Sequence, residues 1–250
     1  MIPLPPRRSF LLVLAAGLLS AAVSPAAIQF QTIDMLAIGL GNASVSNIGP
    51  VTQSSFPYGT PSTLGGVPFL IGDSANQLWG SFFAPGGNGG DDVTQTFPMP
   101  VNDIYGFYTI ANTYWGNPGG ISSFYTFNFD DSSSYTVGLE NGVDIRDFNK
   151  ATNTYANTIN GTTTRQIYDD PLTVYQLDRQ WIDLAAAGHG GKNLASFTIT
   201  DTGAAGLSRV FLVGATAQTG GIGQIPEPSI CALLAASLGA LLVRRRRKEQ

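Results

Sequence analysis

The sequence predicts an all-β protein built as an antiparallel β-sandwich, and three observations support this fold class. Several stretches alternate apolar and polar residues with a period of two, which places one face of a strand inward and the other in solvent. Clusters of turn-forming residues separate these stretches, as connections between strands require. The chain of 250 residues contains 30 glycines and 15 prolines, and its body has no long helical period. We therefore expect about ten strands and almost no helix.

Three weaker strand candidates lie in the first part of the chain, at residues 28–40, 67–71 and 78–83. Two clear candidates follow at residues 103–110 (DIYGFYTI) and 122–129 (SSFYTFNF), which are rich in aromatic residues. Aromatic side chains are enriched in strands because they pack well on a pleated, half-buried surface. Both stretches are apolar on two faces in places, and we predict that they are strands.

The second half of the chain contains four further candidates, of which the first is weaker: residues 135–139, 173–184 (TVYQLDRQWIDL), 196–200 (SFTIT) and 208–217 (SRVFLVGATA). The alternation in the third of these predicts that Phe197 and Ile199 are buried. Glycine-rich and polar turns separate the candidates at residues 116–120, 130–134, 157–161, 188–191 and 201–206. The absence of a tandem repeat of useful length argues against a solenoid or a propeller.

The N-terminus has the features of a secretory signal. Arg7 and Arg8 precede an apolar run of 14 residues, and the small residues Ser24 and Ala26 follow at the spacing that a signal peptidase prefers. Such a run spans only about 21 Å as a helix, against about 30 Å of hydrocarbon, so a removed signal is favoured over a membrane helix. Sec export is favoured over the twin-arginine route, whose pattern the segment matches only in part.

The predicted organisation is a signal peptide at residues 1–26, a β-sandwich domain at 27–221 and a C-terminal segment at 222–250. The domain has six basic residues against 15 acidic ones between Ala27 and Gln224. Nucleic-acid binding needs clustered positive charge to neutralise phosphates, so this function class is excluded. The single cysteine, Cys231, lies in the C-terminal segment, so the domain has no disulfide or thiol chemistry.

The C-terminal segment combines a Pro-Glu-Pro, an apolar run and a basic cluster. The run at residues 230–243 is short for a membrane span, and the cations that follow it would stay on the cytoplasmic side. These three parts resemble the PEP-CTERM sorting signal of bacteria that make extracellular polysaccharide. The resemblance rests on Pro226, Glu227, Pro228, Arg244, Arg245, Arg246 and Arg247.

This resemblance implies two partners, a signal peptidase and an exosortase-type membrane transpeptidase or protease that cuts near the Pro-Glu-Pro. It implies export through the inner membrane, with transient membrane attachment through the C-terminal helix, to the cell envelope or the extracellular space. The alternative is a permanent single-span anchor with a solvated basic tail.

A second resemblance concerns the domain itself. Residues 65–217 resemble galactose-binding-like jelly-roll domains. The resemblance rests on the order of five sequence segments: GGVPFLIG, YTIANTYWG, VGLENGVDIRDFN, LDRQWIDL and FTITDTGAAGLSRVFLVGATA. The resemblance implies a jelly-roll sandwich and sugar binding, with extracellular polysaccharide as a partner.

Two motifs typical of catalytic or metal sites are incomplete in this sequence. Residues 72–74 (GDS) resemble the nucleophile block of SGNH hydrolases, but the only histidine, His189, has Ala186 where those enzymes carry Asp. We expect His189 to be solvated. Residues 86–94 (GGNGGDDVT) fit one calcium-binding nonapeptide, which offers half a site, so we expect a polar surface loop.

The loop carboxylates provide no assigned site either. Asp144 with Asp147, and Asp169 with Asp170, are close pairs that 15 acidic residues produce by chance, so we interpret them as solvated. We expect no cofactor and assign no metal ligand. A structural calcium ion stays open, with oxygen ligands available at Asp91, Asp92, Asp130 and Asp131.

Aromatic side chains are the candidate ligand contacts, because sugar rings present apolar C–H faces that stack on Trp and Tyr. Trp181 alternates with Arg179 and Asp183 on one face of its strand, while Ile182 and Leu184 point to the other. Trp181 is therefore the first candidate for glycan binding. Trp115, with its neighbour Tyr114, is the second; core packing is the alternative fate of each ring.

These observations predict an exported, non-catalytic protein of the envelope or extracellular matrix, either structural or associated with polysaccharide. The alternative is a carbohydrate-binding module with specific glycan affinity. A secreted hydrolase is the third class, and it would need carboxylates gathered in a cleft.

Overall fold

The computed structural model describes residues 27–43, 61–72, 78–117, 119–151, 157–170, 174–204 and 206–220. Hydrogen bonds join nine strands into one antiparallel sheet, in the order β1-β11-β5-β10-β6-β7, with β4 on β11 and the pair β8–β9 on β5. The described part therefore has the antiparallel all-β architecture that the sequence predicts. The two predicted terminal helices and the boundary at residue 221 lie outside the described residues.

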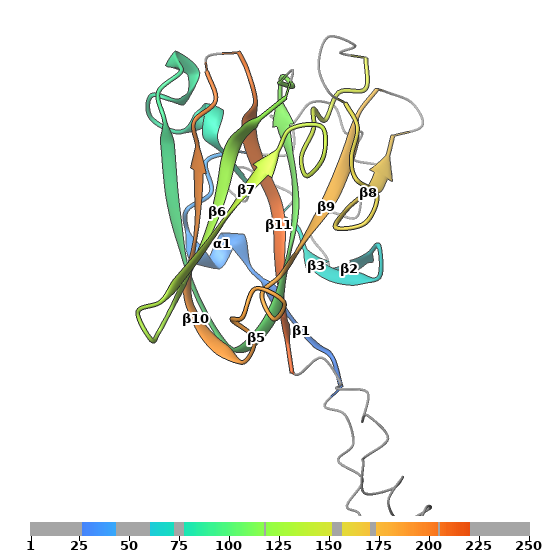
Figure 1. Cartoon of the computed structure of the whole chain (residues 1–250). Coiled ribbons are helices and arrows are strands. Elements are labelled where there is room, and N and C mark those ends of the chain that lie inside the picture. The colour runs from blue at the N-terminus through green and yellow to red at the C-terminus, as the bar shows by residue number, and fades with distance from the viewer. Residues whose placement is uncertain are drawn as a thin grey trace, which may run out of the picture.

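The sheet folds into two layers because one long strand, β5 (Val93–Tyr114), belongs to both. Its first half, up to Ile104, pairs with β10 (Lys192–Asp201). Its second half pairs with β11 (Arg209–Thr219) on one side and with β9 (Gln176–Asp183) on the other. Figure 1 shows β5 curving through the lower end of the molecule as it passes from one layer to the other. The result is a β-sandwich.

Each layer has a simple strand order. The first layer runs β5-β10-β6-β7, with β6 at Ile121–Phe129 and β7 at Ser134–Glu140. The second runs β8-β9-β5-β11, and both β1 and β4 pair with the far side of β11. The remaining bounds in this layer are Gln29–Ile33 for β1, Trp79–Gly80 for β4 and Thr164–Asp169 for β8.

The core between the layers contains a row of aromatic rings that crosses the first layer. Phe97, Phe197, Phe127 and Tyr135 are register partners on adjacent strands, and consecutive ring centroids lie 5.3 to 6.4 Å apart. From the opposite layer, Phe107 packs against Phe197 at 4.9 Å. Alternation places these rings on one face of their strands, so the aromatic stretches of the sequence become the sandwich core. The predicted burial of Phe197 and Ile199 is confirmed.

A second apolar cluster covers part of the outer face of the second layer. The hairpin β2 (Pro61–Leu64) and β3 (Val67–Leu70) packs there, and Phe69 is fully buried against this face. Ile110 and Phe211 contribute from β5 and β11. Tyr108 of β5 is partly buried and packs against this cluster.

Short helical pieces fill the connections. In α1 (Met35–Ile38), the Asp34 carboxylate accepts hydrogen bonds from the backbone N–H groups of Leu36 and Ala37, and Gly39 ends the helix at φ 70°. Two 3-10 turns, η2 (Ser81–Phe83) and η3 (Gly87–Gly89), precede β5. The interpretation of residues 86–94 as one surface loop is wrong in part, because Gly87 is buried and β5 begins at Val93.

Candidate functional site

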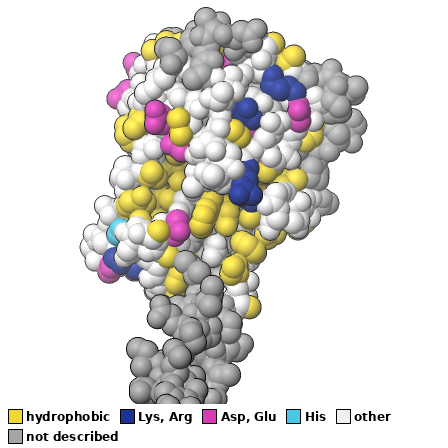
Figure 2. Space-filling model, turned by 45° about the vertical axis from the view of Figure 1, so that its right-hand side comes forward, with side chains coloured by type: hydrophobic (Ala, Val, Ile, Leu, Met, Phe, Trp, Pro, Cys, Tyr) yellow, Lys and Arg dark blue, Asp and Glu magenta, His cyan; other side chains and the backbone are white. Residues whose placement is uncertain are grey.

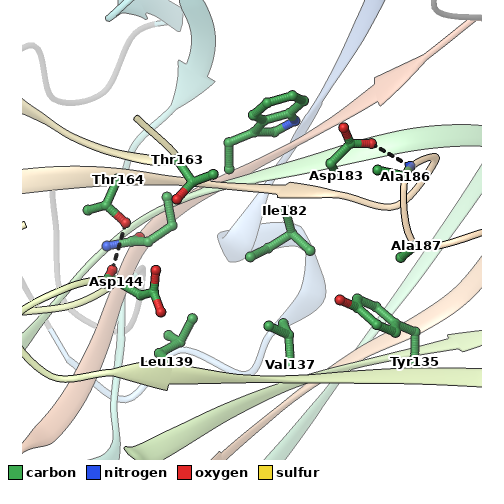
Figure 3. A pocket seen from close by; sticks show the side chains of 12 residues that line it. Tyr135, Val137, Leu139, Asp144, Thr163, Thr164, Ile182, Asp183, Ala186 and Ala187 are labelled. Carbon is green, nitrogen blue, oxygen red and sulfur yellow. Dashed lines mark hydrogen bonds between the residues drawn. The ribbon is translucent and has the colours of Figure 1, made fainter. Parts of the chain in front are cut away.

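The sandwich is open along one edge, where β7 of the first layer faces β9 of the second. A cleft of about 410 Å³ lies there, which is within the size range of small-ligand pockets. Tyr135, Val137 and Leu139 line it from β7, since residues two apart share a face. Ile182 points into it from β9, and Figure 3 shows this side chain above Val137. Figure 2, on the side where β9 comes forward, shows hydrophobic side chains gathered across the face.

Polar groups surround this apolar floor. The Asp144 carboxylate accepts hydrogen bonds from the Glu140 backbone N–H at 3.2 Å and from Asn160 Nδ2 at 3.1 Å. The Asp183 carboxylate accepts one from the Ala186 backbone N–H at 2.8 Å. Figure 3 shows Asp144 at one end of the cleft, whereas Asp183 lies on the other side of the β9 ribbon from Ile182. The cleft thus combines an apolar surface with hydrogen-bond acceptors.

Gln180 forms the deep polar wall of the cleft. Its Nε2 donates to the Ala111 carbonyl oxygen at 2.6 Å, and its Oε1 accepts from Thr109 Oγ1 at 2.8 Å. Both ends of the amide are therefore satisfied within the protein, and its orientation is fixed. This side chain shapes the cleft but has less to offer a ligand than the Asp144 carboxylate.

Trp181 lies on the opposite face of β9, as the alternation predicts. Its ring is nearly parallel to that of Tyr108, at an interplanar angle of 14° and a centroid distance of 6.1 Å. Phe30 of β1 continues the row at 6.1 Å from Tyr108. We call these three residues the aromatic strip. It crosses the outer face beside the β2–β3 hairpin, where Trp181 and Tyr108 are partly buried and Phe30 is 37% exposed.

Two neighbours fix the geometry of the aromatic strip. Gly106 leaves room for the indole, since a Cβ at that position would lie 2.8 Å from Trp181 Nε1. The Arg179 guanidinium lies 5.1 Å above the Tyr108 ring, a cation–π contact, and donates to the Gly65 carbonyl oxygen. Burial raises the pKa of Tyr108 and lowers that of Arg179, which is held in the same apolar surroundings.

Trp115 and Tyr114 lie elsewhere, at the end of β5, and the structure does not bring them to Trp181. Tyr114 is only 7% exposed and packs against Phe211 at 4.9 Å, so burial raises its pKa. Trp115 is 39% exposed and rests on Phe82 at 5.0 Å. Its φ of 53° lies in the left-handed region, which is uncommon for a bulky residue.

The predicted carboxylate pairs do not form paired sites. Asp144 lines the cleft, whereas Asp147 is buried and accepts from the backbone N–H groups of Gly116 and Asn149. Asp169 is exposed and pairs with Lys150, and Asp170 is buried. The interpretation of all four as solvated is therefore wrong for Asp147 and Asp170.

The loop aspartates suggested for calcium are dispersed. Asp131 binds Lys192 at 2.8 Å and accepts from Ser133, and these hydrogen bonds hold its pKa well below the usual range. Asp91 fills the space that Gly86 leaves open. Within the described residues, no group of three or more His, Cys, Asp or Glu side chains is arranged to hold a metal ion.

The expectation that His189 is solvated is wrong in part, because its side chain is only partly exposed. Its ring stacks on Phe129 at a centroid distance of 4.9 Å and an angle of 8°, and Tyr135 lies 5.3 Å away. Its Nδ1 is enclosed and has no hydrogen-bond partner in the described part of the chain. The glycine-rich loop therefore folds back onto the strands and carries the imidazole with it.

The sorting residues Pro226, Glu227, Pro228 and Arg244 to Arg247 lie outside the described residues, as does the N-terminal apolar run. Among the residues that the structure describes, no helix has the length and apolarity to cross a membrane.

Sequence reasoning missed Tyr108 and Phe30 as partners of Trp181, and it missed the cleft. Tyr108 lies in a predicted strand, but its position beside Trp181 depends on the register of β5 and β9. Searches with known proteins add no assignment: no protein-family model matches the sequence, and no curated protein matches it.

Proposed function

We propose that this chain is an exported, non-catalytic protein of the cell envelope or extracellular matrix that associates with polysaccharide through the aromatic strip. The observation that carries the proposal is the row of Trp181, Tyr108 and Phe30 on the outer face of the second layer. In this proposal the sandwich is a galactose-binding-like jelly roll. Its delivery depends on the N-terminal signal and on the PEP-CTERM-type segment, whose partners are a signal peptidase and an exosortase.

The strip suits a saccharide for physical reasons. The apolar C–H faces of sugar rings pack on aromatic rings, while their hydroxyl groups remain free to bind water or protein. Trp181 and Tyr108 present nearly parallel rings on adjacent strands, so one chain of sugars would meet both. The Tyr108 hydroxyl donates a hydrogen bond to Gln218 Oε1 at 3.3 Å. The Gln218 amide therefore lies beside the strip, within reach of sugar hydroxyls.

The proposal is tested by retention of the purified full-length protein on immobilised extracellular polysaccharide. We expect Trp181→Ala to weaken retention about tenfold, because it removes the largest ring of the strip. The control is Trp115→Ala, which removes a tryptophan outside the strip that is 39% exposed. Both variants should keep the melting temperature within a few degrees of wild type.

Two results would contradict the proposal. Unchanged retention of Trp181→Ala would show that the strip does not carry the contact, and absence of retention by wild type would favour a purely structural matrix protein. A specific glycan-binding module, the alternative, would retain one polysaccharide and not others. A hydrolase would release soluble sugar fragments during the same assay.

A further inference from the structure

Two arginines lie side by side on the sheet face that carries the aromatic strip. Arg165 of β8 and Arg179 of β9 are register partners in their antiparallel pair. Such partners point to the same face, with Cβ atoms about 5 Å apart. Arg179 also shares this face with Trp181, because residues two apart in a strand point the same way. Figure 2 shows Lys and Arg side chains lying among hydrophobic ones on the side where β9 comes forward.

No carboxylate of the described residues forms an ion pair with either arginine. Asp178, next to Arg179 in β9, points to the opposite face and binds Arg146. Asp183 shares the face with Arg179 but lies four residues away, about 13 Å along the strand. The ion pairs among the described residues use the other Lys and Arg side chains, those of Arg146, Lys150, Lys192 and Arg209.

This pair of like charges is unfavourable by itself. Like charges directly opposite each other on neighbouring strands destabilise a sheet. Burial lowers the pKa of Arg179, and the nearby charge of Arg165 lowers it further. The domain has only six basic residues against 15 acidic ones between Ala27 and Gln224, so positive charge at this face is a local feature. An unfavourable local arrangement of this kind is typical of a functional site, and a bound anion would relieve the repulsion.

Both guanidinium groups keep donors for such an anion. Each has five N–H donors in a planar fork that matches the oxygens of an anionic group. Arg179 Nη1 donates to the Gly65 carbonyl oxygen, while its Nε is enclosed without a partner in the described part of the chain. Arg165 is exposed, and its Nε donates to the Thr162 carbonyl oxygen at 3.1 Å. These bonds orient the two side chains and leave further N–H groups for a ligand.

We propose that Arg165 and Arg179 bind the acidic group of a sugar, a carboxylate or a sulfate, while the sugar ring packs on the aromatic strip. The Arg179 guanidinium lies 5.1 Å from the centre of the Tyr108 ring, so charge and rings are adjacent. Arg165 makes the direct contact because it is exposed, and Arg179, only 7% exposed, adds its charge. This inference rests on the proposed association with polysaccharide and names its ligand class as an acidic polysaccharide.

Titration calorimetry of the full-length protein tests the inference with four probes. They are an oligogalacturonide, its methyl ester, a sulfated galactan oligosaccharide and oligoglutamate. We expect at least one of the two acidic sugars to bind about fivefold or more tightly than both the methyl ester, which lacks the charge, and oligoglutamate, which lacks the ring. The acidic sugar that binds identifies the anionic group. Raising the salt concentration should weaken its binding more than that of the ester.

The variants remove one positive charge at different places. Arg165→Gln should reduce the preference for the acidic sugar over the methyl ester about threefold or more. The matched control is Lys192→Gln, which removes a charge from the first layer and should leave the preference intact. Arg165→Glu should abolish the preference and also raise the melting temperature, because it replaces a pair of like charges by a pair of opposite ones.

Equal binding of the acidic sugars and the methyl ester would overturn the inference, as would equal loss of the preference in Arg165→Gln and Lys192→Gln. Binding of oligoglutamate as tightly as the acidic sugar would show that no sugar ring is recognised and would overturn it too. An Arg165→Glu variant no more stable than wild type would remove its premise, the repulsion between the arginines. Failure of the proposed function gives a different result, because then neither the oligogalacturonide nor its methyl ester binds.

Discussion

Gly87 shows how strongly a single residue can constrain this fold. A Cβ at this position would lie 1.9 Å from the backbone carbonyl oxygen of Ser81, a contact that no side-chain adjustment relieves. Gly89, in the same turn η3, has nothing within 4 Å of its Cβ position. Alanine substitutions at these two glycines therefore separate the effect of a steric clash from the effect of losing a flexible glycine.

We expect Gly87→Ala to lower the free energy of unfolding by about 2–3 kcal/mol, because the turn before β5 must shift to admit the methyl group. Gly89→Ala should stay within about 0.5 kcal/mol of wild type. Urea denaturation measures both. Equal stabilities for the two variants would show that the packing around Ser81 is looser than described.

At the residue level, the alternation of apolar and polar residues correctly predicted which face of a strand a side chain occupies. Phe197 and Ile199 are buried, and Trp181 and Ile182 lie on opposite faces of β9. His189 was missed because its environment is set by Phe129, which is distant in sequence. A ring contact of this kind leaves no periodic signal in the local sequence.

At the scale of elements, the first half of β5 was the least predictable strand. It contains Pro98 and Pro100, and proline argues against a central strand because it lacks a backbone N–H. Among the described strands this half of β5 pairs with β10, and it is the outer strand of the first layer, a position where proline is tolerated. The short strands β2 and β8 were missed because they are edge strands with little apolar alternation.

The packing of β6 against β5 gives the stability a dependence on alkaline pH. Tyr125 of β6 is fully buried between the layers, and burial raises the pKa of its phenol, although its hydrogen bond to Thr109 lowers it slightly. The unfolded chain releases this proton above about pH 10, whereas the folded chain retains it. Stability is therefore fully present below about pH 10 and falls as the pH rises beyond it.

Tyr125→Phe should move the midpoint of alkaline unfolding to higher pH, while costing about 1 kcal/mol at neutral pH for the lost hydrogen bond. Tyr135→Phe, at a half-buried ring of the cleft, controls for removal of a tyrosine hydroxyl as such. Circular dichroism during a pH titration gives the midpoints. A midpoint for Tyr125→Phe equal to that of wild type would contradict the account of this buried phenol.

At the scale of the whole molecule, the sequence predicted the fold class but not the location of the candidate site. The alternation within strands and the turn residues between them are local sequence features, and together they are enough to predict an antiparallel sandwich. The aromatic strip and the cleft both depend on register: Tyr108 meets Trp181 only because β5 and β9 pair as they do, and Val137 meets Ile182 only across two layers. A single strand cannot specify such contacts.

The three tryptophans lie in three different regions of the molecule, so each can report separately on ligand binding near it. Trp79 is buried in the core, Trp115 lies at the end of β5, and Trp181 lies in the aromatic strip. Each indole N–H gives its own NMR signal, and replacement of each tryptophan by phenylalanine assigns it. A ligand that binds one face will therefore disturb one signal.

The most direct measurement is a titration of the labelled protein with soluble fragments of the extracellular polysaccharide, followed through these three indole signals. The account predicts that the Trp181 signal shifts or broadens with saturation while the Trp79 and Trp115 signals stay in place. A shift of the Trp115 signal with Trp181 unmoved, or no shift in any of them, would contradict the claim that this face binds the glycan.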